Sequence, residues 1–264
     1  MKKISNLTVY RKFLSIHLRS LMQYKASFIM TLLGQFSGAF SAFLTIYFLL
    51  RRFGTVEGYT YQEVLLCFAS IYMAFSLAET FARGLDRFPA VIGNGEFDRI
   101  LVRPRNEIFQ VIASKTELTR LGRLLQAIVT FCYAIPASGI DFTPDKILCL
   151  VLMVVCGALV FVGVFVIFAF ICFFTLEGLE FMNILTDGVR EHGSYPFDIY
   201  GKEIMTVMTF VVPYTLVQVY PLHYLIGRTD SLLNLFAPLL ALVFLIPCAL
   251  LWKLGVRHYK STGS

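Results

Sequence analysis

Charged residues are scarce in this chain. Asp, Glu, Lys and Arg make up only 15% of its 264 residues, against about 25% in a typical soluble protein. Apolar residues reach 57%, including 26 phenylalanines, and one aqueous core of this size cannot hide so much apolar surface. The composition therefore argues against a soluble enzyme and excludes a disordered chain, a small disulfide scaffold and a nucleic-acid-binding module. We expect the lipid bilayer to be its solvent.

Motifs for nucleotide, metal and hydrolytic chemistry are also missing. The fragment Gly201-Lys202-Glu203 lacks the upstream glycine and the Ser or Thr of a P-loop. The six cysteines lie in apolar runs without CxxC or Cys/His spacing, and the four dispersed histidines form no HExxH motif. We therefore expect no catalytic residue, no metal and no cofactor on this chain, and ATP is not expected to bind to it in the P-loop manner.

Six segments are apolar enough, and long enough, to cross a hydrocarbon core that requires about 20 residues. They are residues 26–50, 61–82, 118–136, 146–174, 204–222 and 231–252. The stretch 177–203 carries eight charged residues, and each charge at the bilayer centre costs roughly 2.5–3.5 kcal/mol even on a lenient scale. We therefore predict that this stretch is an interfacial or cytoplasmic connector.

The basic residues are distributed unequally across these spans. With that connector on the side of the termini, 19 of the 23 lysines and arginines fall on the terminal side and four on the other. Because cytoplasmic loops are enriched in Lys and Arg, both termini are predicted to be cytoplasmic.

Residues 1–25 form a separate N-terminal unit, in which residues 7–24 have the period of an amphipathic helix. Its apolar face comprises Tyr10, Leu14, Leu18 and Leu21, and its polar face includes Arg11, Lys12 and Arg19. A basic face opposite an aromatic and leucine face suits the headgroup region of a membrane. We predict an interfacial helix, with packing against other protein as the alternative.

The loop between the second and third spans, about 83–117, predicts a short amphipathic helix over residues 96–103. Gly95 precedes it and Pro104 follows it, and acidic residues at its start with arginines toward its end suit the helix dipole. The candidate residues are Glu96, Phe97, Asp98, Arg99, Ile100, Leu101, Arg103 and Pro104, with an apolar face of Phe97, Ile100 and Leu101. A short helix fixed between two spans can transmit force to both; a solvated loop that only turns the chain is the alternative.

Four strings along the chain bear a family resemblance. Residues 95–104, GEFDRILVRP, resemble the GELD..LLRP signature of one bacterial branch of type-2 ABC transporter permeases. Residues 194–200 (SYPFDIY), 210–213 (FVVP) and 220–227 (YPLHYLIG) resemble the YP..IY, F.IP and P...LLG elements of the same branch, in the same order. Phe97 and Phe197 depart from the pattern, because leucine is more usual at both positions.

The resemblance implies an all-α integral membrane permease in a bacterial cytoplasmic membrane. Residues 26–264 would form six spans, with a cytoplasmic coupling helix in the loop 83–117 and an outer hairpin at about 213–227, interrupted by Pro213, Pro221 and Gly227. It also implies partners, namely two copies of a P-loop ATPase that carries the ATP and magnesium, a second permease that is identical or homologous, and membrane lipid. Phe97, Ile100 and Leu101 would then be buried anchors in the ATPase.

The function that we expect is the membrane subunit of an ATP-driven transporter. Export is favoured over import, because no feature of the sequence suggests docking of an external binding protein. Two other classes stay open. A membrane-embedded lipid-modifying enzyme would need a cluster of acidic residues or histidines at one depth, and a non-transporting scaffold or sensor subunit needs no such signal.

Overall fold

The computed structural model describes residues 5–175 and 183–261. In these ranges the chain is almost entirely helical, with one isolated bridge between Val56 and Tyr59 as its only extended pairing. Five helical segments are long and apolar enough to cross a membrane, and one bent pair of helices is a sixth candidate. The chain is an all-α integral membrane protein, as its composition predicts.

Four of the spans are single helices close to their predicted bounds. They are α2 (Lys25–Phe53), α3 (Tyr61–Asp86), α7 (Leu121–Ala137) and α8 (Pro144–Thr175). The last span consists of α13 (Leu232–Ala241) and α14 (Leu245–His258), joined by a 3-10 turn at Leu242–Phe244. Several of these helices extend beyond the predicted apolar segments, because the helix continues through basic residues at its end.

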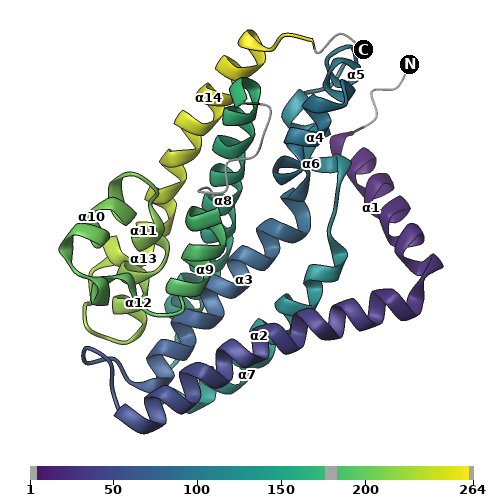
Figure 1. Cartoon of the computed structure of the whole chain (residues 1–264). Coiled ribbons are helices and arrows are strands. Elements are labelled where there is room, and N and C mark those ends of the chain that lie inside the picture. Colours follow the sequence, from purple (N-terminus) through teal and green to yellow (C-terminus); the bar gives the residue numbers. More distant parts are fainter. Residues whose placement is uncertain (1–4, 176–182, 262–264) are drawn as a thin grey trace.

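The helix bundle has two opposite faces (Figure 1). The side chain of Arg105 donates to Asn6, and that of Ser261 donates to Asp98. Both ends of the described chain therefore meet the loop that follows α3, and we call this end the terminal face (Figure 1, top). The opposite end, which we call the hairpin face, holds the loops 54–60, 138–143 and 226–231.

Helix α3 is the centre of the bundle. Its side chains are buried along nearly the whole helix, and it packs against α7 on one side and α8 on the other. Helices α7 and α2 approach closely at Gly122, where a Cβ atom would lie 2.2 Å from the carbonyl oxygen of Leu32. Only glycine permits this approach.

The N-terminal helix α1 (Asn6–Gln23) meets α2 at an elbow at Tyr24 (Figure 1). The hydroxyl of Tyr10 donates to the carbonyl of Phe81, and the Tyr10 ring lies 6.5 Å from the ring of Phe109. The amphipathic helix is thus present, but its inner face packs on α3 and α6 (Glu107–Ser114). Leu18, expected on the apolar face, is exposed, and contact of α1 with a bilayer surface stays a prediction.

The fifth predicted span, 204–222, is not one continuous helix. Helix α10 (Lys202–Phe210) and the pair α11 (Tyr214–Val217) and α12 (Val219–Leu225) meet at an angle of 86°. Pro213 lies at the break, where it lacks the N–H that would continue the helix. The far end of this unit is held at the hairpin face, because Tyr224 donates to Asp145 and Arg228 donates to the carbonyl of Gly58.

The described part of the segment before α10, which begins at residue 183, does not lie where the sequence predicted. Thr175 ends α8 on the terminal face, where Phe174 lies beside His258, whereas Asp198 accepts a hydrogen bond from Tyr59 of the hairpin face. The fifth crossing therefore precedes Asp198, and residues 202–225 enter and leave on the hairpin face. The prediction of an interfacial or cytoplasmic connector is wrong for residues 183–203; positions 177, 180 and 181 lie outside the described residues.

The charges in this segment explain why the prediction failed. Arg190 in α9 (Val189–His192) forms ion pairs with Asp187, at 2.7 Å, and with Glu191. Paired charges lose less on leaving water than the isolated charges that the sequence argument assumed. Arg190 and Lys202 consequently do not belong to the terminal face, where the predicted count of basic residues had placed them.

Candidate functional site

The loop that follows α3 forms three short helices on the terminal face. They are α4 (Phe88–Gly93), α5 (Glu96–Leu101) and α6. Gly95 has a φ of +67°, which allows the sharp turn into α5. Helix α5 ends at Leu101 and not at Arg103 as predicted, because the residue before a proline is disfavoured in the helical region. Arg103 and Pro104 lie in the turn that follows.

The apolar face of α5 is buried within this chain. Phe97 is fully buried, and its ring contacts those of Phe88, Phe173 and Tyr259 at centroid distances of 5.2, 5.4 and 4.9 Å. Ile100 is also buried. The expectation that Phe97 and Ile100 are anchors in another subunit is therefore wrong. They fix α5 to the bundle instead.

This aromatic cluster links α5 to two spans that the sequence did not associate with it. Phe173 belongs to the end of α8, and Trp252 of α14 lies 5.2 Å from the ring of Phe88 and 5.5 Å from that of Phe173. Displacement of α5 would therefore act on α8 and α14 as well as on α3 and α7, which flank the loop.

The outward surface of α5 and the turn after it is exposed, and half of its residues are charged. We call it the coupling surface; it comprises Glu96, Arg99, Leu101, Val102, Arg103 and Pro104. Val102 is 83% exposed and Leu101 38%. The helical period does not identify Val102 as a surface residue, since the helix ends before it. Asp98 is partly covered, because it accepts the hydrogen bond from Ser261.

A buried group of charges lies deeper in the bundle. Glu79 of α3, only 1% exposed, contacts Arg83 at 3.0 Å, Arg123 at 2.7 Å and Arg120 at 3.5 Å. The pair of Glu79 and Arg83 follows from their spacing of four residues. Arg123 of α7 and Arg120 of the turn before α7 reach the same carboxylate. No local pattern in the sequence indicates that contact.

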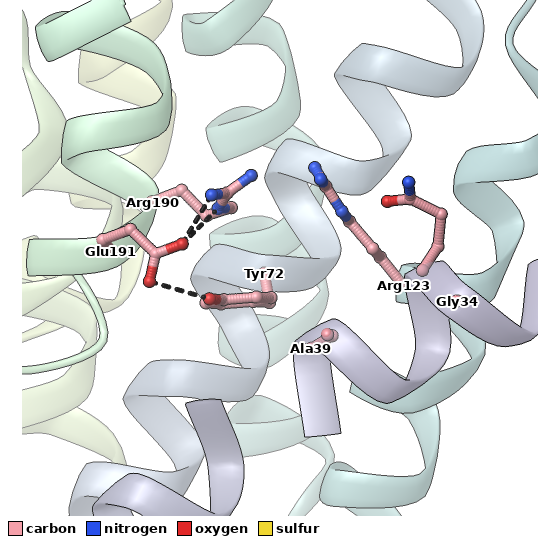
Figure 2. Close-up of a pocket in the computed structure, with 8 residues that line it drawn as sticks. Gly34, Ala39, Tyr72, Arg123, Arg190 and Glu191 are labelled. Atoms are coloured by element: carbon pink, nitrogen blue, oxygen red, sulfur yellow. Dashed lines mark hydrogen bonds and ion pairs between the residues drawn. The ribbon is translucent and has the colours of Figure 1, made fainter. Parts of the chain in front are cut away.

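A pocket of about 280 Å³ adjoins this group (Figure 2). Figure 2 shows Arg123 and Arg190 extending toward the same space from opposite walls, with Tyr72 below them. The hydroxyl of Tyr72 donates to Glu191 at 3.2 Å, and the guanidinium of Arg190 lies 5.8 Å from the Tyr72 ring. Gly34 and Gly38 of α2 form the remaining wall.

The helices that follow Pro213 are tied to the fifth crossing by buried polar contacts. Gln218, which is buried, donates to the carbonyl of Gly193 at 2.6 Å and accepts from the backbone N–H of Phe197 at 3.1 Å. Tyr214 donates to the carbonyl of Leu185. Pro221 is buried in the first turn of α12, and Gly227 makes the exposed turn after it with a φ of +73°.

Three side chains, those of Tyr59, Asp198 and His223, contact one another at the hairpin face. The Tyr59 hydroxyl lies 2.6 Å from Asp198 and 2.7 Å from Nε2 of His223. Burial and the neighbouring Asp198 raise the pKa of Tyr59, so it remains the donor to that carboxylate. Burial opposes ionisation of Asp198, but its hydrogen bonds from His223 and Tyr59 outweigh that effect, and its pKa is lowered. No local sequence pattern indicates this contact, since its members are far apart in the chain.

These features define a multi-pass membrane protein with polar groups inside its bundle, a short helix bound to several spans, and a hairpin that bends back at one face. The sequence profile described as ABC-2 family transporter protein matches residues 36–263. The chain belongs to the ABC-2 family of transporter proteins, whose membrane components are the permeases of ABC transporters. No curated protein and no solved structure matches it.

Proposed function

We propose that this chain is the permease subunit of an ATP-driven exporter and that a separate P-loop ATPase docks on its coupling surface. The observation that carries the proposal is the construction of α5. Its inner face, Phe97 and Ile100, is buried in the bundle, while Leu101, Val102 and two arginines remain exposed. A helix anchored in this way can transmit movement of a partner to the spans without itself leaving the bundle.

The partner and the energy source follow from the chemistry of the chain. It has no P-loop, so ATP and magnesium would be held by the ATPase subunits, two copies in a complete transporter with one below each permease. Arg99 and Arg103 suit acidic residues on that partner, and Leu101 and Val102 supply apolar contact. The second permease, identical or homologous, would lie beside α2, which exposes Ile29, Met30 and Phe48 among other apolar side chains.

Both ends of the described chain lie on the face that carries the coupling surface. An ATPase that uses cellular ATP would place this face, and both termini, in the bacterial cytoplasm. Export is the proposed direction because the described loops of the hairpin face, residues 54–60, 138–143 and 226–231, are short. They offer little surface for an external binding protein.

Co-purification with the ATPase tests the proposal. The double substitution Arg99→Asp with Leu101→Asp should abolish ATPase association without preventing membrane insertion. The matched control is Lys202→Asp with Leu232→Asp, which makes the same change of charge and the same leucine substitution at exposed residues of the hairpin face. Association that survives the first pair would overturn the assignment of the coupling surface, as would equal loss in both pairs.

A further inference from the structure

The pocket between α2, α3, α7 and α9 has hydrogen-bond donors that nothing in the described chain uses. Arg123 donates to Glu79 through Nη1, and no acceptor in residues 5–175 or 183–261 binds its Nε or Nη2. The side-chain oxygen of Gln35, which also lines the pocket, accepts from Arg120 at 3.1 Å. Its amide nitrogen makes no hydrogen bond to the described chain.

The acceptors around the pocket are already engaged. Glu191 accepts from Tyr72 on one oxygen and from Arg190 on the other. Glu79 is shared by Arg83, Arg120 and Arg123. The pocket therefore presents unused donors with a positive charge and hardly any unused acceptors, which selects for a ligand that accepts hydrogen bonds and carries negative charge.

The unused donors face the open space of the pocket, since the Arg123 side chain is 18% exposed. Tyr72 is the twelfth residue of α3, about 16 Å along the helix from its first residue at about 1.5 Å per residue. Glu79 lies about 10 Å further along the same helix. Both residues lie within the helical segment Tyr61–Gly93, which is long and apolar enough to cross a membrane. An ionisable residue within a membrane span is by default a candidate for a substrate pathway or a ligand site.

We propose that this pocket binds an oxyanion, a phosphate or carboxylate group of the transported molecule, with Arg123 and Gln35 as its donors. The inference rests on the proposed transport function. A guanidinium can donate to two oxygens of a phosphate or carboxylate group at once. A ligand with a single acceptor atom cannot form both hydrogen bonds. The pocket takes the charged group only, because its volume of about 280 Å³ is below the range of about 300–1,000 Å³ that encloses a drug-sized ligand.

Helix α2 leaves room for the remainder of the molecule. A Cβ atom built on Gly34 or Gly38 would meet no atom within 4 Å. The two glycines are four residues apart, so they share one face of the helix. The Cβ of a larger residue at Gly38 therefore fits, and its side chain would occupy space at the pocket, which supplies a test that leaves every charge in place.

The test is binding to the purified permease by isothermal titration, without ATPase. The probes are inorganic phosphate, a short-chain phosphatidic acid, and a diacylglycerol of the same chain length that lacks the oxyanion. The variants are Gly38→Leu, which fills the pocket, and Arg123→Gln, which leaves Glu79 with Arg83 and Arg120. The control is Ser37→Leu, at an exposed neighbouring position of α2.

We expect saturable binding of phosphatidic acid, of phosphate, or of both, to the wild type and to Ser37→Leu. Binding should weaken about tenfold or more in Gly38→Leu and in Arg123→Gln. Phosphate alone would indicate a free anion, and phosphatidic acid alone an anionic headgroup. No saturable binding, equal binding of the diacylglycerol, or binding that is unchanged in Gly38→Leu would overturn the proposal. Since no ATPase is present, this failure would be distinct from failure of the coupling surface.

Discussion

Phe97 of α5 packs edge-to-face against Tyr259, with ring centroids 4.9 Å apart and an interplanar angle of 85°. One ring belongs to the short helix on the terminal face, and the other follows the last residue of α14. The contact joins the segment on which an ATPase is proposed to act to the last span of the chain.

Phe97→Ala should destabilise the permease. Removal of a fully buried phenylalanine typically lowers the free energy of unfolding by about 3–5 kcal/mol, and the ring of Phe97 also joins α5 to α8 and α14. Thermal unfolding of the detergent-purified protein measures this loss. Val102→Ala, at an exposed position of the same segment, should stay within about 0.5 kcal/mol. Equal stability of the two variants would contradict the packing.

Glu79→Gln should destabilise the bundle more than an exposed carboxylate does. It removes the carboxylate that three arginines share, and an uncompensated buried charge typically costs about 3–5 kcal/mol. The measurement is the same unfolding experiment, with Glu203→Gln as the exposed control. Adding Arg120→Gln should restore part of the loss, because one unpaired cation is then absent. A purely additive double variant would argue against the network.

Asp198→Asn should lower the free energy of unfolding in a pH-dependent manner, because it changes the contact among Tyr59, Asp198 and His223 at the hairpin face. The pKa of Asp198 is lowered in the folded protein, so its contribution to stability is present above its ordinary pKa and is lost as the pH falls through the lowered value. We expect the variant to be less stable than wild type by about 1–3 kcal/mol at pH 7. The difference should vanish at pH values well below about 3.9, the ordinary pKa of an aspartate.

Unfolding curves at several pH values check this expectation. Asp230→Asn, an exposed position on the same face, is the control and should show no such change. A deficit for Asp198→Asn that persists at the lowest pH would indicate that lost packing, and not the ionised carboxylate, explains the effect.

Single cysteines test the sidedness of the two faces in cells. In a background with the exposed Cys132 replaced by serine, Thr55→Cys and Asp141→Cys should react with an impermeant reagent added from outside. Asn106→Cys should react only after the membrane is opened. The reverse pattern would place the terminal face outside the cell.

Lys202→Cys separates the re-entrant hairpin from a continuous fifth span. Because Gly201 and Lys202 follow the contact of Asp198 with Tyr59, we expect labelling from the same side as Thr55→Cys. Protection equal to that of Asn106→Cys would instead restore the sequence-based connector on the terminal face.

Much of the architecture follows from residue order alone. Continuous apolar runs predicted α2, α3, α7 and α8 within a few residues, because burial in lipid requires length and low charge whatever the neighbours are. The short helix between Gly95 and Pro104 was likewise predictable, since the glycine, which has a positive φ, precedes it and the proline follows it. The predicted residues Glu96 and Arg99 do lie on its exposed side.

The positions of the polar residues were not predictable in this way. The pairing of Glu79 with Arg123 joins groups of α3 and α7 whose desolvation is offset only after the helices have packed. The failure of the connector prediction has the same cause, because a hydropathy argument assigns each charge a penalty in isolation.

The amino-acid order thus decided that this chain is a membrane protein, where most of its helices begin and end, and that a short amphipathic helix follows α3. Those properties depend on local composition, on spacing and on the conformations of single residues. Packing decided that Phe97 faces inward, that the hairpin after Gly201 returns to its own face, and that Arg123 and Arg190 line one pocket. Each of these depends on contacts between residues distant in the chain, whose energies exist only in the assembled bundle.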